Sequence, residues 1–172
     1  MDLSKLFETQ RVLDTRIELE HPPVEGEDRL AKKILALQVE LGECANEWRG
    51  FKFWSNDQEP RTKVPVTAWG EPYKNPLLEE YVDCLHFILS IGLEIGQEYF
   101  YFEPMVKPEN DIISQFAKLF KYAYLITEDD YCSELLTSFI HLGVMLGFTW
   151  EQIEQAYYDK NASNHTRQNT GY

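Results

Sequence analysis

The chain has 172 residues, which is long enough for one domain with a complete core and too short to require two. Hydrophobic residues make up 44% and charged residues 26%, as in an ordinary soluble globular protein, and the formal net charge is −13. This acidic surface repels nucleic-acid polymers and anionic membranes, so we expect neither as a partner. A small polyphosphate would be repelled too, unless bound cations reversed the local field.

The cysteines Cys44, Cys84 and Cys132 are an odd number without Cys-x-x-Cys spacing, so they predict neither a disulfide framework nor a zinc site. We expect each to be a small buried hydrophobe. The first residues lack the apolar segment of a signal peptide, and no apolar run reaches the ~18 residues needed to span a bilayer. We therefore expect a cytoplasmic protein.

Apolar residues recur with helical spacing nearly throughout, which predicts an all-α bundle of about six helices in a single domain, residues 1–172. The first helix is expected over residues 3–19. Gln10 and Asp14 fall on its apolar stripe. A polar side chain on a buried face needs a hydrogen-bond partner, so these two residues either pair within the core or face a pocket.

The second helix is expected over residues 28–48, with Glu40 and Glu43 at the edge of its core face. Residues 50–75 then read as a long irregular loop, rich in aromatic and basic residues that include Lys52 and Trp54. Loops of this length are uncommon inside compact domains unless they bind something or are disordered. This loop is too aromatic for disorder, so we expect it to bind or to pack.

Asn75 and Pro76 predict the start of a third helix, which runs to about residue 95. Its polar face holds Asp83, together with His86 and Ser90. Glu80 lies instead in the apolar sector of the helix, where a carboxylate requires a strong compensating partner. The four histidines show no ligand-like clustering, and we expect them to be surface or hydrogen-bonded residues.

A fourth helix is expected over residues 112–125, with Phe116, Leu119, Phe120 and Ala123 turned inward, and a fifth over residues 130–146, with Gly147 as its C-cap. Residues 149–152 form a capping box that opens a sixth helix, which leads into the polar segment 160–172. In that segment Lys160, Asn164 and Arg167 either hold phosphate oxygens or belong to an exposed tail.

The two acid pairs, Glu40 with Glu43 and Glu80 with Asp83, are the main indication of chemistry. Residues three apart lie on the same side of a helix, so antiparallel packing of the second and third helices would bring all four carboxylates together. Oxygen-only clusters select Mg²⁺, Mn²⁺ or Ca²⁺ over zinc, and their natural task is Lewis-acid work on phosphate. A pair taken alone is weak evidence, because such pairs are more typical of a solvated helix face.

A redox di-iron centre is disfavoured by the same residues. Such centres use Glu-x-x-His pairs on two helices. Asp83 and His86 have this spacing, but residues 28–48 contain no matching histidine. Trp54 in the loop either stacks on a nucleotide base or packs in the core, which is the commoner place of a loop aromatic.

In this order the motifs resemble those of the dimeric dUTPases, a branch of the MazG-like superfamily of all-α nucleoside triphosphate pyrophosphatases. The resemblance rests on residues 6–14, 37–48, 51–55, 78–83 and 160–172, which together extend over nearly the whole chain. The long interval between the acid pairs suits the dUTPase branch better than its shorter MazG-like cousins. Asp14 stands where many relatives carry Asn.

The resemblance implies hydrolysis of dUTP to dUMP and diphosphate, which would keep dUTP out of the nucleotide pool and supply a dTMP precursor. It also suggests dUDP as a further substrate. Two or more Mg²⁺ ions, replaceable by Mn²⁺, would be held by Glu40, Glu43, Glu80 and Asp83. One of the glutamates Glu40 and Glu43 would be the general base.

The resemblance also assigns substrate contacts. It places Gln10 and Asp14 by the uracil and sugar, Lys52 and Trp54 at the substrate, with Trp54 in the base pocket, and Lys160, Asn164 and Arg167 at the phosphates and sugar. Sites of this family are completed by a second subunit, so a homodimer is expected. The alternatives are a pyrophosphatase for another pyrimidine deoxynucleotide such as dCTP, and a non-catalytic helical dimer that binds a nucleotide or a protein.

Overall fold

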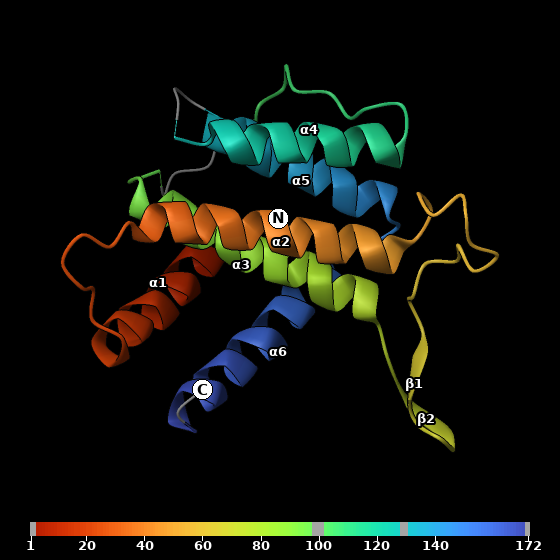
Figure 1. The fold of residues 1–172 in the computed structure, drawn as a ribbon, viewed down its shortest axis with the longest axis horizontal. Helices are drawn as coiled ribbons and strands as arrows, with labels where there is room; N and C mark the ends of the chain where they lie inside the picture. The colour runs from red at the N-terminus through yellow and green to blue at the C-terminus, as the bar shows by residue number, and fades with distance from the viewer. Residues whose placement is uncertain (1–2, 98–101, 128–130, 171–172) are drawn as a thin grey trace.

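The computed structural model describes residues 3–97, 102–127 and 131–170. In this part of the chain it contains six α-helices and one two-stranded hairpin (Figure 1). The helices are α1 (Leu3–Glu20), α2 (Arg29–Trp48), α3 (Pro76–Glu94), α4 (Ile112–Leu125), α5 (Tyr131–Met145) and α6 (Trp150–Asn169), and the strands are β1 (Val64–Thr67) and β2 (Gly70–Lys74). The prediction of an all-α bundle of about six helices is confirmed.

Local side-chain chemistry fixes the ends of the helices where the sequence predicted them. The Asn75 side chain accepts a hydrogen bond from the Leu78 amide and Pro76 occupies the first turn of α3. Thr149 and Gln152 form both halves of a capping box at the start of α6. Gly147, which follows α5, adopts a φ of +85°, a conformation that favours glycine. The start predicted for the fifth helix at residue 130 lies outside the described residues.

Three expectations need correction. The loop expected over residues 50–75 contains an antiparallel hairpin in which Val64 pairs with Lys74 and Pro65 with Tyr73. Phe120, expected to face the core, is 37% exposed, because α4 buries a narrower stripe than its apolar residues suggest. The segment that begins at Lys160, expected to follow the sixth helix, is largely part of it, since α6 continues to Asn169.

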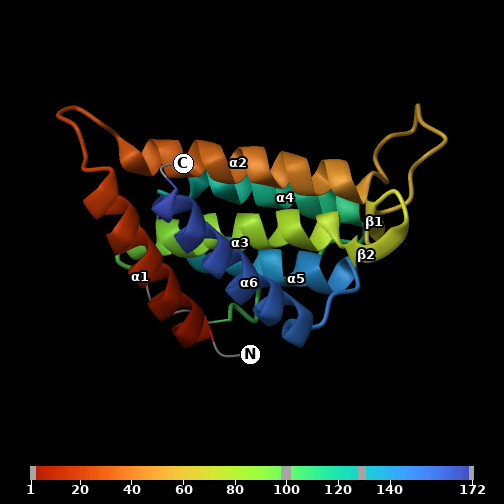
Figure 2. The ribbon, with the colours of Figure 1, turned by 90° about the horizontal axis from the view of Figure 1, so that it is seen from below.

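The helices form three layers of two. In Figure 1, α4 and α5 lie above α2 and α3, and α1 and α6 lie below them; Figure 2 shows α1 and α6 crossing the lower face of α3. The central helix α3 contacts α1, α2, α5 and α6, and it is buried along most of its length. The core therefore surrounds most of α3, and a buried polar residue on this helix needs a hydrogen-bond partner among its four neighbours.

The three cysteines are free and buried, as predicted, and act as small core residues. No described helix is by itself long and apolar enough to cross a membrane. Only α5 and α6 taken together, with a 110° bend between them, meet the length and composition required.

Close packing between α3 and α5 leaves no room for a side chain at Gly143. A Cβ built there would lie 2.5 Å from the hydroxyl oxygen of Tyr81, which is itself 1% exposed and stacked on Phe139 at a ring-centroid distance of 4.2 Å. Gly143→Ala should lower the free energy of unfolding by about 1–3 kcal/mol, because Tyr81 must leave its packed position.

Gly42 provides the matched control, because a Cβ built there in the middle of α2 meets no atom within 4 Å. Gly42→Ala should raise the free energy of unfolding by about 0.5–1 kcal/mol through helix propensity alone. Urea denaturation followed by circular dichroism measures both. Equal effects of the two substitutions would show that the packing at Tyr81 is not as tight as described.

Candidate active site

Three carboxylates meet where α2 packs against α3. One oxygen each from Glu40, Glu80 and Asp83 lies within 4.8 Å of the other two, and all three residues are half-buried. Glu40 comes from the middle of α2, whereas Glu80 and Asp83 come from the first two turns of α3. The convergence expected from the two acid pairs is therefore present for three of the four acids.

The fourth acid, Glu43, lies beside this group and not within it. It is exposed, and none of its oxygens belongs to the set that converges within 4.8 Å. Its negative charge nevertheless contributes to the raised pKa values of Glu40, Glu80 and Asp83, so it is close enough to act on all three. Glu43 thus stands at the solvent side of the acid cluster, one helical turn from Glu40.

The carboxylates of this cluster repel one another, and burial disfavours their charged forms. Burial, followed by the charges of Asp83 and Glu43, raises the pKa of Glu40 from 4.5 to about 7. Burial and then the neighbouring acids raise the pKa of Glu80 to about 7 as well. Burial also raises the pKa of Asp83, against the opposing effect of Lys160. Half-buried acids at this spacing need positive charge to stay ionised together at neutral pH.

Part of that charge comes from α6. The Lys160 ammonium donates a hydrogen bond to one carboxylate oxygen of Asp83. Asn164 and Arg167 follow at intervals of four and three residues, on the same face of the helix, and line the same pocket as Lys160. The charge of Arg167 also lowers the pKa of Asp83, so it lies near the acids. The continued helix is what presents these three side chains together.

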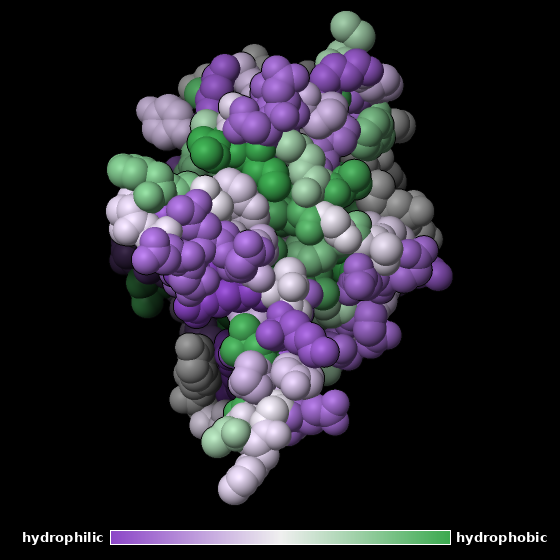
Figure 3. All heavy atoms as spheres, turned by 90° about the vertical axis from the view of Figure 1, so that its right-hand side faces the viewer, coloured by the Kyte–Doolittle hydropathy of each residue, from purple (hydrophilic) through white to green (hydrophobic). Residues whose placement is uncertain are grey.

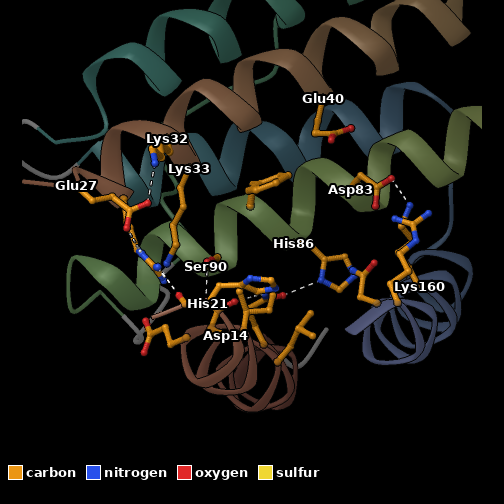
Figure 4. Close-up of a pocket in the computed structure, with 18 residues that line it drawn as sticks. Asp14, His21, Glu27, Lys32, Lys33, Glu40, Asp83, His86, Ser90 and Lys160 are labelled. Atoms are coloured by element: carbon orange, nitrogen blue, oxygen red, sulfur yellow. Dashed lines mark hydrogen bonds and ion pairs between the residues drawn. The ribbon is translucent and has the colours of Figure 1, made fainter. Parts of the chain in front are cut away.

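A pocket of about 420 Å³ opens beside the acids between α1, α2, α3 and α6 (Figure 4). Glu40, Asp83 and Lys160 lie at one end of it, and Glu27, Lys32 and Lys33 at the other. The predicted residues that line it are Gln10, Asp14, Glu40, Asp83, Lys160, Asn164 and Arg167. The structure therefore brings to one cavity most of the residues singled out in the sequence.

Between the two ends of the pocket runs a network of buried polar side chains, shown in part in Figure 4. Gln10, 3% exposed, donates from its amide nitrogen to Asp14 at 2.8 Å, and its amide oxygen lies 2.8 Å from Nδ1 of His86 and 2.9 Å from the Tyr157 hydroxyl. Ser90 donates to the other Asp14 oxygen at 2.7 Å. Gln10 and Asp14 thus have partners in the core and also face the pocket.

Lys52 and Trp54 do not reach this pocket within their own chain. The Lys52 ammonium donates to the side-chain oxygen of Asn46, and the Trp54 side chain is 65% exposed, in edge contact with Phe51 and Phe53. Trp54 is thus neither a core residue nor a wall of the cavity. Its predicted place at the base stays a prediction.

Sequence reasoning did not assign a site role to His86, Phe87 or Tyr157. His86 and Phe87 line the pocket, and His86 stacks on the Tyr157 ring at 4.2 Å. A signal existed for His86, because it lies on the same polar face of α3 as Asp83 and Ser90. No signal marked Tyr157, since an aromatic residue on the apolar face of a helix is ordinarily core.

The residues present fit a hard divalent cation. The donor set contains carboxylate oxygens only, the three oxygens are close enough to share an ion, and the acids repel one another without one. In the described part of the chain these are the residues that group in this way, and neither cysteine nor histidine belongs to the set. Glu40, Glu80 and Asp83, with Glu43 at their edge, would hold the ion.

An all-α bundle that sets clustered carboxylates against cationic side chains beside a pocket belongs to the class of helical nucleoside triphosphate hydrolases. A family model described as dUTPase matches residues 2–172. The chain therefore belongs to the dimeric all-α dUTPase family, and it is an enzyme that hydrolyses dUTP. None of the curated proteins compared with it matches the chain.

The raised pKa values predict how Mg²⁺ should act on stability at different pH. A carboxyl whose pKa rises from 4.5 to about 7 on folding favours the folded state below pH 4.5 and loses that contribution as the pH rises through 7. Protons therefore compete with the cation below neutral pH. Mg²⁺ at 100 times its dissociation constant should stabilise the protein by about 2.7 kcal/mol above pH 7.5.

Near pH 5.5 the same Mg²⁺ concentration should produce a much smaller effect. The measurement is the Tm in Mg²⁺ minus the Tm in EDTA at each pH, which cancels groups outside the site. A difference that is absent, or that is the same at pH 5.5 and 8, would mean that these acids do not hold the ion.

Proposed function

We propose that this dUTPase uses Mg²⁺ to convert dUTP into dUMP and diphosphate, and that it acts as a homodimer. The same site would accept dUDP, and the physiological result would be a nucleotide pool kept free of dUTP. The observation that carries the proposal is the meeting of Glu40, Glu80 and Asp83 within 4.8 Å, beside a pocket lined by Lys160. Oxygen ligands of this kind suit Mg²⁺, with Mn²⁺ as a substitute.

In this proposal the acids and the cations of the site have separate tasks. Glu40, Glu43, Glu80 and Asp83 hold the metal, which when bound polarises the phosphoryl group and activates water. One of the two α2 glutamates accepts the proton of the attacking water.

Lys160, Asn164 and Arg167 bind phosphate oxygens, for which their common helical face and their place beside the acids suit them. The ammonium of Lys160 already lies against Asp83, so it can bridge the metal end of the site and an anionic substrate. Gln10 and Asp14, farther along the pocket, bind the base and sugar.

The proposal of a second subunit rests on exposed aromatic side chains that do not reach the pocket of their own chain. Phe53, Trp54 and Trp69 are 86%, 65% and 95% exposed, and all three belong to the segment between α2 and α3. Figure 3 looks onto the end of the molecule that carries this segment. Large exposed aromatics of this kind mark interaction surfaces. We place Trp54, with Lys52, at the base pocket of the partner subunit.

Glu80→Gln tests the acid cluster, because it removes one negative ligand and keeps the size of the side chain. Turnover of dUTP in Mg²⁺ should fall about 100-fold or more, since a direct ligand contributes more than the outer-shell groups whose loss costs 10- to 100-fold. Product chromatography with dUTP and dCTP measures the effect and also tests the dCTP alternative.

Glu79→Gln is the matched control. Glu79 is the preceding residue on α3, its side chain is 48% exposed, and its ion pair with Lys74 is long at 3.9 Å. We expect unchanged turnover. Full activity of Glu80→Gln in a folded protein would remove the basis of the proposed function.

Mixing two inactive variants tests whether Trp54 acts across the dimer. Trp54→Ala and Glu80→Gln should each be inactive, but a mixed dimer would contain one site with both residues intact. Random pairing of co-expressed chains should therefore restore about a quarter of wild-type activity. Glu80→Gln mixed with Asp83→Asn is the control and should stay inactive, since both residues belong to the same chain's site. An inactive Trp54→Ala and Glu80→Gln mixture that contains verified mixed dimers would place Trp54 elsewhere.

A further inference from the structure

Each hydrogen bond of the buried network at the pocket has a defined donor and acceptor. They follow from which atoms can donate a hydrogen and which can only accept one. Asp14 accepts hydrogen bonds only, so the Gln10 atom that faces it at 2.8 Å must be the amide nitrogen. The amide oxygen of Gln10 then faces His86 and Tyr157, and an oxygen can only accept. His86 Nδ1 must therefore carry its hydrogen, and the Tyr157 hydroxyl must donate.

The network is also held firmly in place. Gln10, His86, Ser90 and Tyr157 are each 6% exposed or less, and the Tyr157 ring stacks on His86. Burial lowers the pKa of His86 to about 3, so its ring stays neutral at any working pH. The single hydrogen of the Tyr157 hydroxyl lies between two carbonyl oxygens, at 2.9 Å from Gln10 and 3.2 Å from Leu6.

Reversal of the Gln10 amide is opposed from both sides. A reversed amide would place its oxygen against the Asp14 carboxylate, which repels it, and would leave the hydrogens of His86 Nδ1 and Tyr157 facing an NH₂ group. Ser90 strengthens the first effect, because its bond to the second Asp14 oxygen holds the carboxylate in position. One amide N–H of Gln10 is used by Asp14, so the other is the group left for the pocket that Gln10 lines.

We propose that His86 and Tyr157 are positioning residues for base selection: they fix the Gln10 amide so that its remaining N–H faces the 4-position of the pyrimidine. Uracil carries a carbonyl oxygen there, which accepts this hydrogen. Cytosine carries an amino group, which presents hydrogens to the same N–H and cannot accept. A site with a fixed polar group discriminates well, because the wrong base leaves that buried group unpaired.

This inference rests on the proposed function, because it places the base of the substrate at Gln10. His86 and Tyr157 do not touch the substrate in this scheme, and they act through the amide of Gln10. The scheme accounts for two features that a merely packed core does not require: a glutamine that is 3% exposed on the apolar stripe of α1, and a neutral histidine turned toward it.

Tyr157→Phe is the first test, since it removes the hydroxyl and keeps the stacked ring. The readout is the ratio of kcat/KM for dUTP to kcat/KM for dCTP, measured on the full-length protein in Mg²⁺. We expect this ratio to fall about 3- to 10-fold, the effect of losing one hydrogen bond. Tyr158→Phe is the control, because it removes a hydroxyl from the next residue of α6. That hydroxyl has no hydrogen bond within the described residues, so the ratio of kcat/KM values should not change.

A pair of substitutions at His86 separates positioning from packing and keeps the test open if Tyr157→Phe fails to fold. His86→Asn retains an N–H close to the position of Nδ1, whereas His86→Leu does not. Both lose the ring stack, so both should lower the Tm. Only His86→Leu should lower the dUTP-to-dCTP ratio by about 3- to 10-fold, and His86→Asn should keep most of it.

Two outcomes would overturn the inference: an unchanged ratio in Tyr157→Phe or His86→Leu, and an equal loss for both nucleotides. The second would show that the network supports the fold or the sugar and does not read the base. Failure of the proposed function looks different. In that case the wild-type protein itself would not prefer dUTP, or Glu80→Gln would keep its activity.

Discussion

The repulsion among half-buried carboxylates at the junction of α2 and α3 is the constraint on which the site depends. Helix packing alone would favour apolar residues at this junction. The two residues between Glu80 and Asp83, Tyr81 and Val82, are indeed fully buried, so the acids stand out against their neighbours. The cost of these acids is offset by the burial of most of α3 against its four neighbouring helices. The buried part of α3 thus contributes the stability that offsets the cost of clustering acids near the start of the same helix.

The cations that balance these acids come from a helix distant in sequence. Lys160 is 77 residues from Asp83, yet α6 crosses α3 so that the two side chains meet. Tyr157, three residues before Lys160, is fully buried against His86 and the α1 backbone. The same helix therefore anchors itself in the core with one residue and reaches the acids with the next turn. Fold and site are built from successive turns along one face of α6.

Much of this arrangement could be predicted from the sequence, because each helix buries one stripe and its caps are explicit. The positions of Asn75, Pro76 and the capping box at Thr149 fixed two helix starts, and Glu80 in an apolar sector pointed to the acid cluster. The hairpin could not be predicted in this way, since nearly all of its residues are exposed and no alternation of burial marks its strands. The direction of the Gln10 amide depends on contacts between three helices, which no periodicity reports. The place proposed for Trp54 involves a second chain, on which the periodicity of one chain carries no information.

The hairpin that projects from the bundle has a consequence for the behaviour of the protein in concentrated solution. Exposed strand edges normally invite pairing with strands of other molecules, and this can end in fibres. Here Pro65 lies within β1 and Pro72 within β2, and neither has an amide hydrogen to offer an incoming strand. Lys63 and Lys74 add positive charge at the ends of the two strands. The hairpin can therefore extend into solvent, away from the protection of the core, without acting as a template for aggregation.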